Sequence, residues 1–191
     1  PTVACPLFSS RTPAVALSWR LRRMAGTTQE NCMNRPMIAA LLALTVQLAV
    51  AGDDSTVPYP EGYRDWRHVK SMVIEPGHPL HAAFGGIHHL YANAGAVQGY
   101  RSGHFPDGAV IVFDLLEARS ADNAITEGPR KIVGVMVRDS KRYAATGGWG
   151  FEGFRGDSTT DRAVGPNAAS ACFACHQPQK DREYVFSSMR N

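Results

Sequence analysis

The sequence predicts an α+β domain, in which an antiparallel β-sheet carries short flanking helices and a C-terminal helix with a cysteine and histidine motif. Runs rich in Val, Ile and aromatic residues recur through the middle of the chain and are bounded by Gly, Pro, Asp and Asn, which is typical of strands. The sequence lacks the four long repeats of helical apolar spacing that a four-helix bundle needs. No linker or internal repeat divides residues 52–191, so we expect them to form one domain.

Each element is predicted from a local pattern. Tyr63, Trp66 and Val69 have the spacing of one helical face, so we expect a short helix over 63–69. The strand-like runs are 86–92, 109–117, 132–137 and 149–154. The other predicted helices are 94–100, which Ser102 and Gly103 would end, and the closing segments 168–176 and 181–189.

Near the C-terminus, Cys172-Phe173-Ala174-Cys175-His176 has the attachment signature of c-type haem. On a short helical turn the two thiols can reach the two vinyl groups on one porphyrin edge, and the histidine lies beneath the iron as its proximal ligand. We therefore expect one covalent haem c per chain, held by Cys172, Cys175 and His176. A zinc site or a redox dithiol is the alternative, but residues 177–191 contain neither Cys nor His to complete a zinc site.

The first 51 residues predict export. Arg35 precedes an apolar run over 37–50, and the run ends in the small-x-small sequence of a signal peptidase site, so we interpret 33–51 as a secretory signal peptide. A transmembrane anchor is the alternative, although the run is short for a bilayer. Residues 1–32 are interpreted as a non-native upstream extension, with an unusually long leader as the alternative. Because haem c is attached outside the cytoplasm, we expect a periplasmic protein that has left the membrane after cleavage.

The basic charge of the chain belongs mostly to this leader. The chain carries 20 Lys+Arg and 17 Asp+Glu, a formal net charge of +3. Five of the arginines but only one of the acidic residues precede residue 52, so residues 52–191 have a formal charge of −1. This balance gives no reason to expect nucleic acid or an anionic membrane as a partner.

Several short motifs together resemble the cytochrome P-460 and cytochrome c′-beta family. The motifs are Tyr63-Arg64-x-Trp66, residues 88–93, 103–109, 137–143 and 148–152, and the terminal Cys-x-x-Cys-His. The resemblance runs over nearly all of the mature chain. It implies a homodimer of mainly antiparallel sheets, with one high-spin haem whose distal side is open to small molecules.

The resemblance also implies two functional branches. Members that oxidise hydroxylamine carry a lysine, cross-linked to the porphyrin, in the strand after the Asp-Gly turn, whereas c′-beta members lack it and bind nitric oxide and carbon monoxide. The motif places Phe113 at that position, and a phenylalanine has no nucleophilic nitrogen. Lys70 is the nearest rival for a cross-link, but it is out of register with the family lysine, and we interpret it as a surface residue. If the strand were shifted by one residue, Asp114 or Val112 would face the haem instead.

His88 and His89 are adjacent in a predicted strand, so their side chains point to opposite faces and at most one reaches the haem. The resemblance places His88 on the distal side, where a neutral imidazole would donate a hydrogen bond to a ligand or coordinate the iron; a core or surface histidine is the alternative. With Phe113 this makes a largely apolar distal pocket, which favours small uncharged diatomic ligands.

The expected function is therefore nitric oxide binding or scavenging by an exported mono-haem cytochrome. One alternative is a haem-dependent oxidoreductase that acts on hydroxylamine or nitric oxide. The other is a six-coordinate electron carrier with its own redox partner protein, for which Met72, Met136 and Met189 are the candidate sixth ligands.

Overall fold

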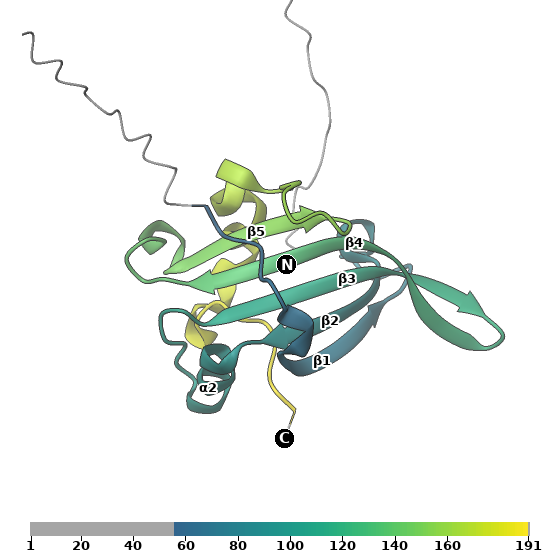
Figure 1. Ribbon diagram of the computed structural model, residues 1–191, viewed down its shortest axis with the longest axis horizontal. Helices are drawn as coiled ribbons and strands as arrows, with labels where there is room; N and C mark the ends of the chain where they lie inside the picture. The colour runs from purple at the N-terminus through teal and green to yellow at the C-terminus, as the bar shows by residue number, and fades with distance from the viewer. Residues whose placement is uncertain (1–55, 191) are drawn as a thin grey trace, which may run out of the picture. The chain divides into compact units, whose positions relative to one another are not determined.

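Five antiparallel strands make up the sheet in the computed structural model of this chain, which describes residues 56–190. The strands are β1 (Arg67–Ile74), β2 (Gly86–Ala92), β3 (Val110–Ala121), β4 (Ala124–Arg138) and β5 (Trp149–Arg155). Each strand pairs with the next one along the chain, so β1 and β5 are the two edges (Figure 1). The predicted class, an antiparallel sheet with short helices, is confirmed.

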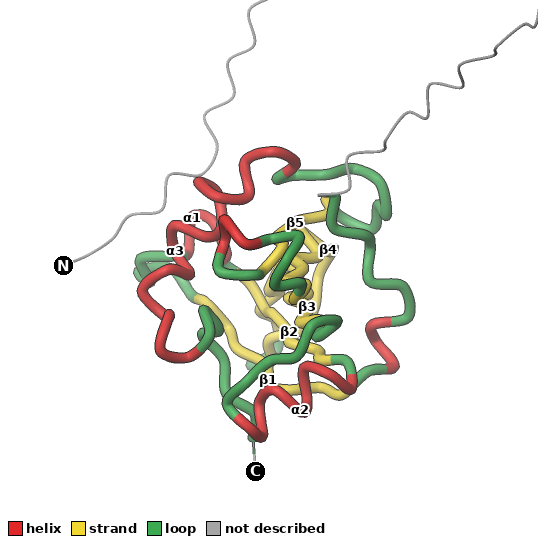
Figure 2. Tube along the Cα trace, turned by 90° about the vertical axis from the view of Figure 1, so that its left-hand side faces the viewer, coloured by secondary structure: helices red, strands yellow, loops and turns green. Residues whose placement is uncertain are grey.

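Short helices flank the sheet, as Figure 2 shows from a second direction. They are α1 (His81–Phe84) and α2 (Ala94–Ser102), with 3₁₀ turns η1 (Tyr63–Asp65), η2 (Ala144–Thr146) and η3 (Gly165–Asn167). A continuous helical segment follows, made of the π-helical turn η4 (Ala169–Phe173), α3 (Ala174–His176) and the 3₁₀ helix η5 (Gln177–Arg182). This confirms the predicted C-terminal helix with its two cysteines.

The two faces of the sheet carry separate hydrophobic clusters, because successive side chains of a strand point to opposite sides. On one face, Ile111 and Phe151 pack with α2 and with Cys172 and Phe173 of the C-terminal segment. We call this the C-terminal face. On the other, the N-terminal face, Val112 and its neighbours pack against the segment that enters β1.

Local signals account for the elements that were predicted closely. β2 spans the predicted residues, and α2 begins where the Asn93 side chain accepts a hydrogen bond from the Ala96 N–H. It ends at Gly103, whose φ of 78° is left-handed, a conformation that glycine adopts without strain.

Two helix predictions were wrong. Over 63–69 only the 3₁₀ turn η1 forms, because Trp66 is extended and the chain from Arg67 pairs with β2 instead. In place of the helix over 181–189, the helical segment ends at Arg182, since Glu183 and Tyr184 both have left-handed φ angles, 50° and 66°.

β3 and β4 are longer than predicted and form a hairpin that extends beyond the other strands (Figure 1). Asp122 and Asn123, with φ of 52° and 59°, make its two-residue turn. The hairpin end is exposed on both faces, so the apolar alternation that marks a half-buried strand is absent there.

The predicted extension over 1–32 and the signal peptide over 33–51 lie outside the described residues. Between residues 56 and 190, no helix is both long and apolar enough to span a membrane.

Candidate haem-binding site

The cysteines and the histidine of the motif share one helical segment, with Cys172 in η4 and Cys175 and His176 in α3. Cys172 is partly buried against the cluster of the C-terminal face. Burial, and secondarily the charge of Glu152, raises the pKa of its thiol to about 11.

The imidazole of His176 is oriented by a backbone carbonyl. The distance from its Nδ1 to the Tyr184 oxygen is 2.7 Å, and since a carbonyl only accepts, Nδ1 carries the proton. The aromatic rings of Phe151 and Phe186 flank the imidazole at centroid distances of 5.0 Å and 4.9 Å. Burial lowers the pKa of His176, so the ring is neutral and its Nε2 has a lone pair to give to a metal.

Phe113 and His88, the predicted distal residues, lie together on the C-terminal face. Their ring centroids are 4.6 Å apart, and the Phe113 ring also meets Phe84 edge-on at 5.8 Å. Phe113 shares its face with Ile111, whereas Val112 belongs to the cluster of the opposite face and Asp114 is bonded to Tyr63 there. The sequence alternative that turns Val112 or Asp114 toward the C-terminal segment is therefore excluded.

His88 is a buried polar group with one unpartnered nitrogen. It is 3% exposed, and its Nδ1 has no hydrogen bond. Burial, with a smaller contribution from His89, lowers the pKa of His88 to about 4, so the imidazole is neutral at physiological pH. An unsatisfied nitrogen of this kind is costly unless a ligand satisfies it, so His88 is a candidate to bind a ligand on this face.

Lys70 lies on the same face, in the edge strand β1. The sheet register aligns Lys70 with Leu90, and Leu90 in turn with Phe113. The side chain is partly buried, and its Nζ donates to the Ser188 Oγ at 3.2 Å. Sequence reasoning missed this placement because Val69 is an extra residue at an irregularity of β1, which shifts the alternation by one position.

Gly134 of β4 faces Phe113 across the sheet, and Gly153 of β5 continues the same row. Phe151, which contacts His176, lies two residues along β5, so strand spacing puts it about 12 Å from Phe113 in the sheet. That separation is comparable to the width of a porphyrin. The Cys-x-x-Cys-His motif, an oriented imidazole and an unpartnered polar atom on one face of the sheet together fit a haem.

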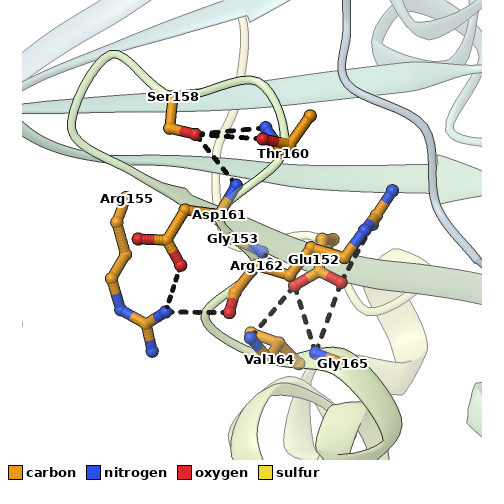
Figure 3. A network of polar contacts seen from close by, with 9 residues as sticks. All are labelled: Glu152, Gly153, Arg155, Ser158, Thr160, Asp161, Arg162, Val164 and Gly165. Atoms are coloured by element: carbon orange, nitrogen blue, oxygen red, sulfur yellow. Dashed lines mark hydrogen bonds and ion pairs between the residues drawn. The ribbon is translucent and has the colours of Figure 1, made fainter.

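Glu152 fixes the loop that leads into the attachment segment, as Figure 3 shows. This carboxylate is 5% exposed and accepts hydrogen bonds from the backbone N–H groups of Gly153, Val164 and Gly165. The guanidinium of Arg162 pairs with it at 3.1 Å and also donates to the Val57 carbonyl. Glu152 follows Phe151 in β5, so the same strand supplies the contact to His176 and the anchor of the loop before it.

Comparison of the sequence with models of known protein families gives one match. The family model described as Cytochrome P460 matches residues 60–187, which covers the sheet and the attachment segment. No curated protein sequence matches the chain significantly.

Proposed function

Because the chain belongs to the cytochrome P460 family of haem proteins, we propose that it holds one haem c through Cys172, Cys175 and His176 and binds small diatomic ligands, foremost nitric oxide. The observation that carries the proposal is the composition of the C-terminal face. Phe113 presents an aromatic ring there, and the neutral His88 beside it has an Nδ1 without a hydrogen-bond partner.

On the proximal side, the chain prepares one nitrogen for the iron. The Tyr184 carbonyl holds the proton on Nδ1 of His176 and leaves Nε2 for coordination. Phe151 and Phe186 restrict the ring, so that its plane is set before the metal is bound. Bound haem would supply the iron that takes up the gas, with His176 as the residue that would hold it.

On the distal side, the chain selects its ligand by size and charge. Phe113 offers no hydrogen bond and excludes water, which disfavours charged or strongly hydrated ligands. His88 is neutral, so it presents either an N–H donor or a lone pair without adding charge. Nitric oxide and carbon monoxide meet both conditions, because they are small and uncharged.

Absorption spectra of the haem-loaded chain from residue 52 test the proposal in the ferric, ferrous and NO-treated ferrous forms. We expect a high-spin spectrum of ordinary haem c type that shifts on addition of NO.

Phe113→Ala should speed NO association several-fold because it removes the aromatic ring that would cover the distal side of the haem. Tyr91→Ala is the matched control, since this half-buried aromatic points to the opposite face of β2, and it should leave the rate unchanged. A low-spin spectrum indifferent to NO would show an electron carrier instead.

The position of Lys70 favours one other function, oxidation of hydroxylamine or a related nitrogen compound on a cross-linked haem. Its amine lies on the C-terminal face in the same cross-strand row as Phe113. This alternative expects a strongly red-shifted ferrous band that returns to the ordinary position in Lys70→Arg. Lys131→Arg, which keeps a lysine-like donor for the Gly85 carbonyl, is the control. An ordinary ferrous band in the unmodified chain would eliminate this function.

We further propose that the mature protein starts at Gly52, acts in the periplasm as a homodimer and exchanges electrons with a partner protein. The small-x-small sequence before Gly52 supports the cleavage site. Intact mass after export would identify the first residue, and light scattering on the same sample would give a mass twice that of one chain. A first residue other than Gly52, or a single-chain mass, would contradict the respective part.

A further inference from the structure

Three polar side chains form a hydrogen-bonded line on the N-terminal face, away from the haem site. The Ser71 Oγ lies 2.6 Å from the Nδ1 of His89, and the Nε2 of His89 lies 2.6 Å from a carboxylate oxygen of Glu127. A hydroxyl beside an imidazole whose other nitrogen meets a carboxylate is the arrangement of a base-activated nucleophile.

The sheet brings these residues together from separate strands. Ser71 in β1 is directly opposite His89 in β2, so their side chains are cross-strand neighbours. Glu127 comes from β4, where it is opposite Ala118 of β3. Two shifts in the register between β3 and β4 precede Ala118 along β3. These irregularities bend the hairpin, and the carboxylate reaches His89 past β3.

The hydrogen bonds have a single consistent direction. Glu127 accepts from the Nε2–H of His89, so Nδ1 of His89 is an acceptor and Ser71 donates its proton to it. The Ser71 oxygen accepts in turn from Nε2 of His68 at 2.9 Å. The other nitrogen of His68 faces the Arg190 guanidinium at 3.4 Å, and because a guanidinium only donates, that nitrogen carries no proton. Burial, followed by the charge of Arg190, lowers the pKa of His68 and keeps the ring neutral.

This direction polarises the hydroxyl from both sides. His89 is placed to take the proton, and the N–H of His68 binds a lone pair of the same oxygen, which orients the hydroxyl proton toward His89. The imidazole of His89 is shielded, with 19% of its side chain exposed, whereas Ser71 is open to solvent. β1 is an edge strand of the sheet that residues 56–190 form, so the backbone N–H groups along its outer side pair with no further described strand and are candidate donors to an oxyanion.

We propose that Ser71 is a catalytic nucleophile, with His89 as its base and Glu127 as the residue that positions His89, and that it cleaves small activated carboxylic esters. The Ser71 oxygen forms a bond to the acyl carbon while its proton moves to Nδ1 of His89. The carbon–oxygen bond to the leaving alcohol then breaks, and His89 gives that proton to the departing oxygen. Water attacks the acyl-serine by the same route, releases the acid and restores the Ser71 hydroxyl.

The test uses the haem-loaded chain and 4-nitrophenyl acetate as the probe. Mass spectrometry of the peptide that contains Ser71 measures its acetylation directly, without interference from haem absorption or from reactions at other residues. We expect acetylated Ser71 in the unmodified chain and a fall in its rate of formation by about 100-fold or more in His89→Gln, the usual loss for a general base. Glu127→Gln should lower the rate less, because it disturbs only the orientation of His89.

Controls separate this chemistry from ordinary surface reactivity. Ser120→Ala removes another exposed strand serine and should change nothing, while Ser71→Ala should abolish the adduct and the matching nitrophenol burst. Equal thermal midpoints among the variants would show that they are folded. Absence of an acetyl group on Ser71, or an unchanged rate in His89→Gln, would overturn the proposal.

Discussion

A single residue, Tyr184, shows what the motif could and could not predict about the haem site. The spacing of Cys172, Cys175 and His176 gave the candidate ligands directly, because the covalent chemistry fixes their separation. Nothing in the sequence marks Tyr184 as the acceptor for His176. Its carbonyl reaches Nδ1 only because Glu183 and Tyr184 adopt left-handed angles after the helix, and in non-glycine residues these depend on tertiary contacts.

The buried imidazole of His88 predicts a loss of stability in mild acid. Its pKa of about 4 lies below the ordinary 6.5, so between these pH values the unfolded chain binds a proton at this ring that the folded chain does not. The free energy of unfolding should therefore be fully retained above pH 6.5 and should fall as the pH decreases toward 4, by on the order of 3 kcal/mol.

Urea unfolding of the unmodified chain and of His88→Leu across this pH range measures the effect. The difference between the two proteins isolates His88, because the other titrating groups are common to both. We expect the variant to lose this part of the pH dependence while the apolar leucine still packs on Phe113. Parallel curves for the two proteins would show that the ring is not held neutral by burial.

At the level of whole elements, prediction succeeded where the local signal and the tertiary contacts agree. β2 has its own apolar run, and α2 has both a capping asparagine and a terminal glycine. β1 failed because Tyr63, Trp66 and Val69 have helical spacing by coincidence, and only pairing with β2 makes the segment extended. The tail after Tyr184 failed for a similar reason, since it is held by bonds from Lys70 and Tyr100 to distant serines.

The loop before the attachment segment should depend on the charge of Glu152. Glu152→Gln keeps the shape but weakens the bonds from two backbone N–H groups of the loop and leaves Arg162 without its counter-charge. We expect a cost of about 2 kcal/mol in the free energy of unfolding and faster hydrogen exchange over the loop. Asp161→Asn is the matched control, because its ion pair with Arg155 is exposed and should contribute under about 1 kcal/mol. Equal stabilities of the two variants would contradict this role of Glu152.

Across the described domain, the sheet separates two kinds of polar chemistry. The C-terminal face holds the attachment motif with one unpartnered imidazole, and the N-terminal face holds the line from His68 to Glu127. Alternation along β2 places His88 on the first face and His89 on the second, as the sequence predicted from their adjacency. The hydrogen-bonded line from His68 to Glu127 could not be predicted, because it joins β1, β2 and β4.

This separation predicts that the two sites act independently. Phe113 and Ser71 lie two strands apart, on opposite faces, and have no partner in common among their described contacts. Residues about 10 Å apart without shared partners usually contribute additively to the free energy of unfolding, to within about 0.5 kcal/mol.

The double variant Phe113→Ala and Ser71→Ala should therefore lose as much unfolding free energy as the two single variants together. Ser71→Ala should keep the NO-binding spectrum, and Phe113→Ala should keep the rate of Ser71 acetylation. Two results would contradict this independence: a coupling energy above about 1 kcal/mol, or a change of one activity by the variant on the opposite face. Either result would mean that the sheet transmits a structural change between the sites through the His88-His89 backbone.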